Sequence, residues 1–425
     1  MEKIQATQAM FSKIALKIRE NKYLNAISTG LMSIMVLMIV GSIATLIASV
    51  QWVPWQNVIE ASGLRPFLLG LNNMTNGLIA VFATFAIAYQ LGIGLGKNPF
   101  NSAILSLMVF LTLTPTAPLY EMGELGGNAI PFQWLGATGL FSAIVIALLT
   151  TIIYSKVVDK GWIIKMPDGV PPMISNSFSA LIPGFIIAII AIIVRMGLSL
   201  TEFGYIHNVI FRFVATPLTN VGSNPIAVTF AVFISAVLWF FGIHGMNILL
   251  ATIQPILMPL QLENLAAFEA GYELPNMIVW QNVSLFGNLG GSGSTIGLVF
   301  AMVWFAKSKQ YKTLGKIALA PTLFGINEPI LFGFPLVLNF KTIVPFILTP
   351  VLIFATGIAL IYIGILPRAT GVLTPLGTPI IISGFIAGGY RYALFQVAGT
   401  VVSFFMYSRV FLRLDKEAVA REKGK

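Results

Sequence analysis

A lone acidic side chain stands in a long apolar stretch near the C-terminal end of the chain. The charged residues between positions 317 and 408 are Glu328, Lys341, Arg368 and Arg391. At the centre of a bilayer a charge costs about 2.5–3.5 kcal/mol on insertion scales, so it generally has a function or a partner. We interpret Glu328 as a functional carboxylate; the alternative is a residue that only plugs a break in a helix.

The residues around Glu328 predict a bent tip at positions 325–329, with the sequence Gly-Ile-Asn-Glu-Pro. Pro329 disfavours helical geometry at the residue before it and has no N–H to donate. Gly325 loosens the preceding turn. We expect Asn327 and Glu328 to face a cavity, where a buried Glu328 would hydrogen-bond to a sugar hydroxyl or accept its proton.

The second candidate is His244, which glycines bracket in the sequence Gly-Ile-His-Gly at positions 242–245. A lone histidine in an apolar chain is more often a core residue whose hydrogen bonds are satisfied. Glycines on both sides instead favour the close approach of a ligand, so we predict a functional role. His207, the other histidine, lies in an amphipathic stretch that tolerates the residue without any function.

Amide side chains and a tryptophan gather at positions 276–294, a stretch that Gly, Asn and Pro interrupt. Trp280 and Asn282 suit a sugar, because amides both donate and accept hydrogen bonds and an indole face packs against a pyranose ring. The Gly-Gly-Ser-Gly run at 290–293 is equally typical of close helix packing. For Lys97 and Asn98, a charge anchor at the membrane surface explains the sequence as well as a ligand role does.

The composition is that of a membrane protein. Of the 425 residues 57% are hydrophobic and 9% are charged, and the mean hydropathy is +0.88. A soluble domain has about 25% charged residues, so lipid must be the solvent here. The length suits about ten spans of roughly 20 residues each. The sequence has no cysteine and two histidines, so we expect neither a metal site nor a cofactor.

The basic residues follow the positive-inside pattern. Acidic loops, such as residues 121–124 and 263–273, alternate with six basic segments, which hold 20 of the 25 basic residues: 3–22, 97, 156–165, 307–316, 341 and 409–425. This alternation predicts that both termini are cytoplasmic and argues against nucleic acid as a partner. Residues 3–22 read as an amphipathic helix on the inner leaflet, and not as a cleaved signal.

We therefore predict an all-α polytopic membrane protein with about ten transmembrane helices. The predicted spans are 27–50, 64–93, 101–118, 134–154, 178–200, 225–243, 246–260, 294–306, 343–364 and 393–411. Residues 274–293 and 317–340 are too interrupted for lipid-facing helices, so we predict two re-entrant hairpins, one from each side. Broken helices that face each other near the midplane form substrate sites in transporters.

The Asn-Glu-Pro-Ile tip at 327–330 and the Gly-Ile-His-Gly turn at 242–245 lie about 80 residues apart. Together they resemble the membrane component (IIC) of bacterial phosphotransferase-system sugar permeases, in the lactose/cellobiose/diacetylchitobiose branch. The resemblance covers essentially the whole chain. It implies a homodimer in the bacterial cytoplasmic (inner) membrane, with a five-span scaffold half at 1–200, an amphipathic connector at 201–224 and a mobile, substrate-binding half at 225–425.

The resemblance also implies roles for individual residues. Glu328 and His244 take the places of the catalytic pair. The implied sugar contacts are Lys97, Asn98, His207 and Asn282, to which the reading of the residues adds Asn327 and Trp280. Arg391 is also counted among the substrate-binding residues, although Gly388-Gly389-Tyr390 precedes it where the family pattern has an acidic residue.

The mechanism that the resemblance implies is phosphorylation coupled to transport. The phosphoryl group comes from a phosphocysteine of a IIB protein. IIB in turn receives the phosphoryl group from enzyme I through HPr and IIA. The chain has no cysteine, so IIB must be separate and dock on the cytoplasmic face. Glu328 would orient and deprotonate the sugar hydroxyl, and His244 would bind the sugar or the phosphoryl group. The alternatives are a proton-coupled sugar symporter with Glu328 as proton carrier, and a lipid-linked or ion-conducting protein without sugar specificity.

Overall fold

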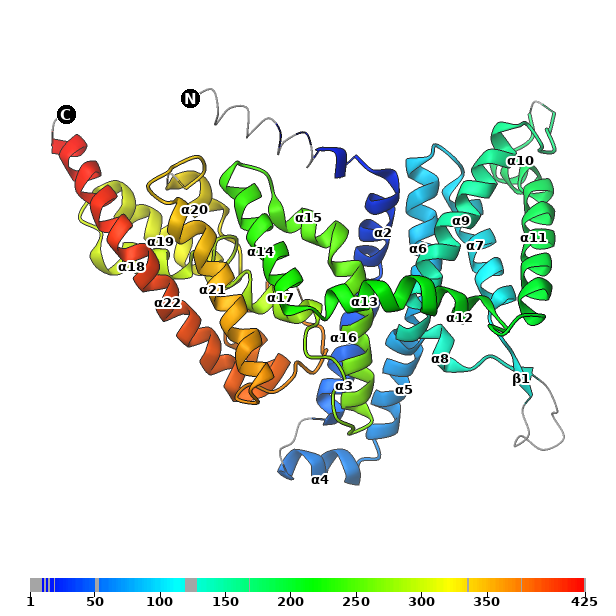
Figure 1. The fold of residues 1–425 in the computed structure, drawn as a ribbon, viewed down its shortest axis with the longest axis horizontal. Coiled ribbons are helices and arrows are strands. Elements are labelled where there is room, and N and C mark those ends of the chain that lie inside the picture. The colour runs from blue at the N-terminus through cyan, green and yellow to red at the C-terminus, as the bar shows by residue number, and fades with distance from the viewer. Residues whose placement is uncertain are drawn as a thin grey trace. The chain divides into compact units, whose positions relative to one another are not determined.

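The structure is a computed structural model that describes residues 10, 13, 16–18, 20–49, 53–118, 128–167, 169–334, 336–375 and 377–423. The regular secondary structure of the described residues is helical, apart from two paired strands of two residues each (Figure 1). It divides into two compact units, Arg19–Asn220 and Val221–Lys425 with Met1–Ile18. The division falls inside the predicted connector at 201–224. Much of the predicted inner-leaflet helix at 3–22 lies outside the described residues.

The unit Arg19–Asn220 contains helices over each of the first five predicted spans. Its elements are α2 (Lys22–Ser33), α3 (Met35–Ser49), α4 (Val53–Ala61), α5 (Arg65–Thr75), η1 (Asn76–Leu78), α6 (Ile79–Gly94), α7 (Pro99–Leu113), α8 (Phe132–Leu135), η3 (Ala137–Gly139), α9 (Leu140–Asp159), α10 (Pro172–Ser179), α11 (Leu181–Ser199), α12 (Ile206–Ile210), the π-helix η4 (Phe211–Ala215) and α13 (Thr216–Gly222). Strands β1 (Ala117–Pro118) and β2 (Asn128–Ala129) pair antiparallel. Buried small residues of α6, among them Ala80, Ala83 and Ala88, let neighbouring helices approach closely.

The unit that begins at Val221 contains both predicted broken segments. Its helices are α14 (Pro225–Phe240), α15 (Gly245–Thr252), α16 (Gln254–Glu269), α17 (Trp280–Phe286), α18 (Ile296–Phe305), α19 (Lys309–Leu323), α20 (Glu328–Gly333), α21 (Ile343–Tyr362) and α22 (Ile382–Lys423). The first broken segment forms α17 and an irregular turn before α18. The second forms α19 and α20 with a break between them. In α22 the backbone leaves helical geometry at Gly388 and Gly389.

The membrane character of the chain is confirmed. Five described helices or helix runs are long and apolar enough to cross a membrane: Arg65–Gly94, Ala137–Asp159, Pro172–Ser199, Ile343–Tyr362 and Ile382–Lys423. Up to eight spans result if each of three bent helix pairs counts as one. Two further apolar helices, α7 and α18, are shorter. The count of ten spans and the re-entrant course of the hairpins stay predictions.

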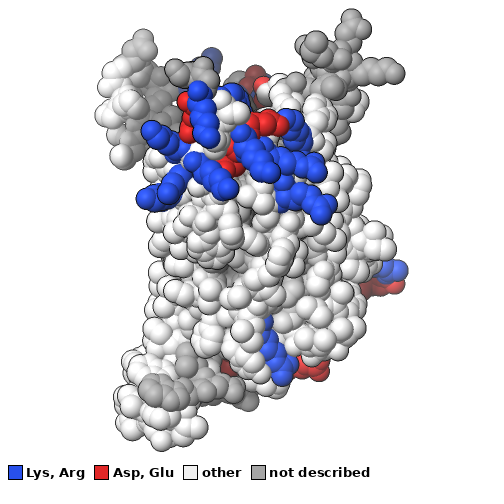
Figure 2. Space-filling model, turned by 90° about the vertical axis from the view of Figure 1, so that its left-hand side faces the viewer, with Lys and Arg blue, Asp and Glu red and all other residues white. Residues whose placement is uncertain are grey.

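Two predicted cytoplasmic segments, 307–316 and 409–423, lie together. Asp415 of α22 accepts hydrogen bonds from the backbone N–H groups of Lys307 and Ser308 at 2.8 and 3.0 Å, and Glu422 caps the next two residues. Lys and Arg side chains gather at one end of the face in Figure 2. A shared basic end is what the positive-inside rule requires of segments on the same side of a membrane.

Candidate functional site

The predicted break before Glu328 is present in the structure. Helix α19 ends at Leu323, and α20 begins at Glu328 with Pro329 in its first turn. Gly325 has a φ of +79°, a left-handed conformation that favours glycine. We call residues 325–329 the glutamate tip. It brings α20 back against the core of its unit, where Ile330 and Leu331 are buried.

The expectation that Glu328 is buried is wrong: its side chain is exposed. The reason lies one residue earlier, because Asn327 takes the buried position of the tip and is 3% exposed. The side-chain N–H groups of Asn327 donate to the Ser292 carbonyl and to the Thr295 hydroxyl, both at 2.7 Å. Its side-chain oxygen accepts from the Ser292 N–H at 3.2 Å. The neighbouring carboxylate therefore remains accessible.

Residues 290–295, which we call the glycine turn, receive the amide of Asn327. At Gly291, where φ is +95°, a Cβ atom would lie 2.3 Å from Cγ of Asn327. On the other side, the Tyr407 hydroxyl donates to the Gly293 carbonyl at 2.7 Å, and the Ser403 hydroxyl donates to the Ser294 carbonyl at 2.5 Å. Buried side chains thus satisfy the irregular backbone, as such a segment needs inside a membrane.

His244 sits at the start of α15 and caps it. Its Nδ1 accepts a hydrogen bond from the Asn247 N–H at 3.2 Å, so in the neutral ring the proton is on Nε2. The ring is exposed. Gly245 allows α15 to pack on α14, because a Cβ there would lie 2.0 Å from the Ser235 carbonyl oxygen. Gly245 therefore has a structural role in helix contact, beside the predicted role in ligand access.

The structure places His244 and Glu328 in the same compact unit. They are far apart in the sequence, yet the Glu328 carboxylate is close enough to act electrostatically on the imidazole. Both side chains are exposed; Glu328 is the first residue of α20, and His244 is the N-cap residue of α15. This unit thus presents an accessible acceptor for a proton and an accessible N–H donor within electrostatic reach of each other.

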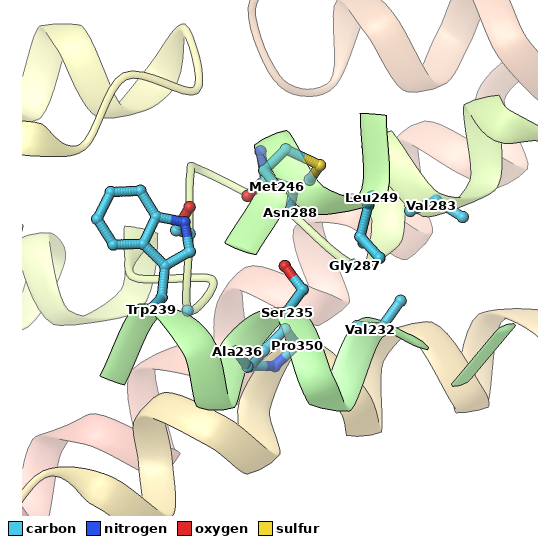
Figure 3. Close-up of a pocket in the computed structure, with 12 residues that line it drawn as sticks. Val232, Ser235, Ala236, Trp239, Met246, Leu249, Val283, Gly287, Asn288 and Pro350 are labelled. Atoms are coloured by element: carbon cyan, nitrogen blue, oxygen red, sulfur yellow. The ribbon is translucent and has the colours of Figure 1, made fainter. Parts of the chain in front are cut away.

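Trp239 contacts His244, and reasoning from the sequence did not single it out. Its ring lies 4.4 Å from that of His244, centroid to centroid, at the end of α14. It borders a cavity of about 10 Å³, which Ser235, Met246 and Asn288 also line (Figure 3). The Nε1 atom of Trp239 is buried and has no hydrogen-bond partner among the described residues. The one feature of the sequence that could have pointed to Trp239 is its position, five residues before the candidate His244.

Three other predicted contacts belong to the same unit. Asn282 is fully buried; its oxygen accepts from the Val279 N–H at 2.8 Å, and its NH2 group donates to the Tyr392 hydroxyl at 3.2 Å. Trp280 begins α17 and is 9% exposed. Arg391 is exposed and donates to the Ile365 carbonyl at 3.3 Å. In this conformation Asn282 is occupied with protein groups, whereas Arg391 is accessible.

Lys97 and Asn98 lie in the other unit and have local partners there. Lys97 forms an ion pair with Asp159 at the end of α9. The Asn98 side chain accepts from the Asn101 N–H at 3.0 Å and so caps α7. These contacts fix the junction between α6 and α7. They give each residue a structural role beside the predicted one.

His207 also lies in the unit Arg19–Asn220, and it is buried completely. Its Nε2 is 3.0 Å from the Thr114 hydroxyl. The imidazole stacks on Trp134 with ring centroids 4.8 Å apart and meets the edge of Phe110 at 5.6 Å. The side chain packs the connector against α7 and α8, and it is not exposed at an interfacial surface.

Comparisons with known proteins point to one family. The family model "Phosphotransferase system, EIIC" matches residues 28–350. The oligo-beta-mannoside-specific EIIC component of Bacillus subtilis (strain 168) is 34% identical over 96% of this chain and 93% of that protein. The cellobiose-specific EIIC component of Geobacillus stearothermophilus is 35% identical over 97% and 94%.

A solved structure is similar over almost the whole chain. It is the crystal structure of the transporter ChbC, the IIC component from the N,N'-diacetylchitobiose-specific phosphotransferase system, with a TM-score of 0.91 and 35% identity over 97% of this chain and 98% of that one. Several relatives match nearly end to end, and the family model matches most of the chain. The chain therefore belongs to the EIIC family of the sugar-transporting phosphotransferase system.

Proposed function

We propose that the chain carries a β-linked disaccharide across the bacterial cytoplasmic membrane and phosphorylates it from a separate IIB protein. The observation that carries the proposal is the accessible Glu328 carboxylate within electrostatic reach of the accessible His244, both at the starts of short helices. The relatives support the class of sugar, since their names specify cellobiose, oligo-beta-mannoside and lactose. Cellobiose, diacetylchitobiose and lactose are the candidates.

The chemistry follows from the two side chains. Glu328 accepts the proton of a sugar hydroxyl, whose oxygen attacks phosphorus as the S–P bond to a IIB cysteine breaks; the thiolate stays on IIB. The Nε2–H of His244 donates to the phosphoryl oxygens, so negative charge is stabilised where it develops. The 425 residues contain no cysteine, so the phosphocysteine stands outside them. IIA, HPr and enzyme I would recharge IIB.

The same proposal includes the arrangement in the membrane. The chain would form a homodimer through the half at 1–200, with both termini in the cytoplasm. The half at 225–425 would carry the sugar as one body, and the segments at 274–293 and 317–340 would be re-entrant. Two features support this arrangement: the broken helices around the glycine turn and the glutamate tip, and the adjacent basic segments at 307–316 and 409–423.

The test is sugar uptake into vesicles that hold the purified protein. One set receives phosphorylated IIB, and a matched set receives a proton gradient without IIB. Sugar phosphate that appears only with phosphorylated IIB supports the proposal. Unmodified sugar that accumulates with the gradient alone would favour a symporter with Glu328 as proton carrier. Parallel assays with cellobiose, diacetylchitobiose and lactose assign the substrate.

A further inference from the structure

The glycine turn and the glutamate tip are locked together by one side chain. Asn327 makes three hydrogen bonds across the gap, two to the backbone of Ser292 and one to the Thr295 hydroxyl. A primary amide has two N–H donors, and both are used here. Asn327 is 3% exposed, so no donor of its side chain is left for a sugar.

The partner of Asn327 is itself fixed. The carbonyls that follow Ser292 in the turn accept from Tyr407 and Ser403 of α22, and the Ser403 hydroxyl also accepts from the Gly297 N–H at 3.0 Å. The glycine turn is thus bound to a long helix on one side and to Asn327 on the other. We call the three hydrogen bonds of Asn327 the lock. Because Asn327 and Glu328 are adjacent in the chain, the lock holds the Glu328 backbone at a fixed position relative to α22.

We propose that Asn327 is a positioning residue, which holds Glu328 in the geometry for proton transfer and does not bind the sugar. The inference rests on the proposed function of Glu328. It revises the sequence-based assignment of Asn327 as a ligand. Apart from the lock, local backbone hydrogen bonds hold the glutamate tip: the Gly325 and Ile326 N–H groups donate to the carbonyls of Thr322 and Pro321 at the end of α19, both at 3.0 Å. These bonds do not tie the tip to the glycine turn, and a displacement of about 1 Å at a reacting group can cost 10²-fold in rate.

The sharpest test removes one bond of the lock without changing side-chain shape. Thr295→Val deletes the hydroxyl that accepts from Asn327 and keeps the volume; Thr295→Ser keeps the hydroxyl. We expect Thr295→Val to lower kcat for sugar phosphorylation about tenfold or more, with sugar affinity changed less than about twofold. Thr295→Ser should keep the kcat of the unmodified protein. Equal kcat for both variants and the unmodified protein would overturn the inference.

A matched control separates positioning from stability. Asn264 is fully buried and makes the same set of bonds elsewhere in the unit: its NH2 group donates to the Asn276 and Ala369 carbonyls at 2.9 and 2.8 Å, and its oxygen accepts from the Asn276 N–H at 2.8 Å. Asn264→Ala and Asn327→Ala should both lower the melting temperature, but only Asn327→Ala should lower kcat per folded molecule. A loss of sugar affinity by Asn327→Ala that matches its loss of kcat would instead make Asn327 a ligand.

The failure of this inference can be told from the failure of the proposed function. Glu328→Gln is measured in the same assay. If Glu328→Gln phosphorylates sugar at the unmodified rate, the role of Glu328 is wrong. If Glu328→Gln is inactive while Thr295→Val and Asn327→Ala retain full kcat, the role of Glu328 stands and the positioning role of Asn327 is wrong.

Discussion

Asp415 and Ser308 join the C-terminal helix to the start of α19 through two hydrogen bonds. One Asp415 oxygen accepts from the Ser308 N–H at 3.0 Å and from the Ser308 hydroxyl at 2.6 Å. Its other oxygen accepts from the Lys307 N–H, and Asp415 is 2% exposed. A buried carboxylate with three donors is a strong link, because charge-assisted hydrogen bonds are stronger than neutral ones.

We therefore predict that Asp415→Ala destabilises the unit that begins at Val221. Three donors at the start of α19 lose their acceptor, and each buried donor left unpaired costs about 1–3 kcal/mol. Thermal unfolding in detergent should show a lower melting temperature. Glu422→Gln is the control: Glu422 also caps α19, at the Lys309 and Gln310 N–H groups, but at an exposed position, so the change should be smaller. Equal melting temperatures for Asp415→Ala and the unmodified protein would contradict the prediction.

Glu328→Gln should abolish sugar phosphorylation and leave sugar binding largely intact. The amide keeps the size and the hydrogen-bonding reach of the side chain but cannot accept a proton, and general-base catalysis typically contributes 10²–10⁴-fold. Sugar phosphate is measured in vesicles with phosphorylated IIB, and affinity is measured separately by titration. Glu60→Gln, at an exposed carboxylate in the other unit, is the control. A near-normal rate from Glu328→Gln would remove this residue from the reaction.

His244→Asn separates the two roles of the histidine. An asparagine oxygen can replace Nδ1 as the acceptor for the Asn247 N–H, since Asn is a preferred N-cap residue. It cannot replace the Nε2–H donor. We predict that His244→Asn folds normally and that its rate of sugar phosphorylation is about 10²-fold lower. His244→Ala should show the same loss and also lower stability by about 1 kcal/mol, because the cap is gone.

If His244→Asn instead phosphorylated sugar at the normal rate while His244→Ala was slow, the histidine would act only through the cap. Circular dichroism and gel filtration of both variants check that the comparison is between folded proteins.

The orientation in the membrane can be tested with single cysteines, because the sequence has none of its own. Cysteine at Glu273, whose side chain is exposed, should react with an impermeant thiol reagent added to intact cells. Cysteine at Lys312, in the basic segment at 307–316, should react only after the cells are opened. Both positions lie in the same unit, so one experiment fixes its orientation. Reversed labelling would contradict the positive-inside assignment.

The sequence by itself determined the features that depend on composition and on near neighbours. Lipid as the solvent follows from the scarcity of charge. The break between α19 and α20 follows from Gly325 and Pro329, because backbone geometry depends on the residue and the residues beside it. The separation of α14 from α15 likewise follows the predicted spans 225–243 and 246–260, which meet at His244. For these features no knowledge of distant residues was needed.

The tertiary structure alone decided which side chains have partners and which are accessible. The sequence predicted Asn327 as a sugar contact and gave no sign of Ser292, 35 residues away, to which its side chain is hydrogen-bonded. Glu328 is exposed, the reverse of what its local sequence predicted, and His207 is buried in a stretch whose sequence did not predict its burial. Trp239 became part of the site through its contact with His244. Burial and hydrogen bonding depend on contacts between helices that are far apart in the sequence, and a local sequence pattern does not show which helices will be in contact.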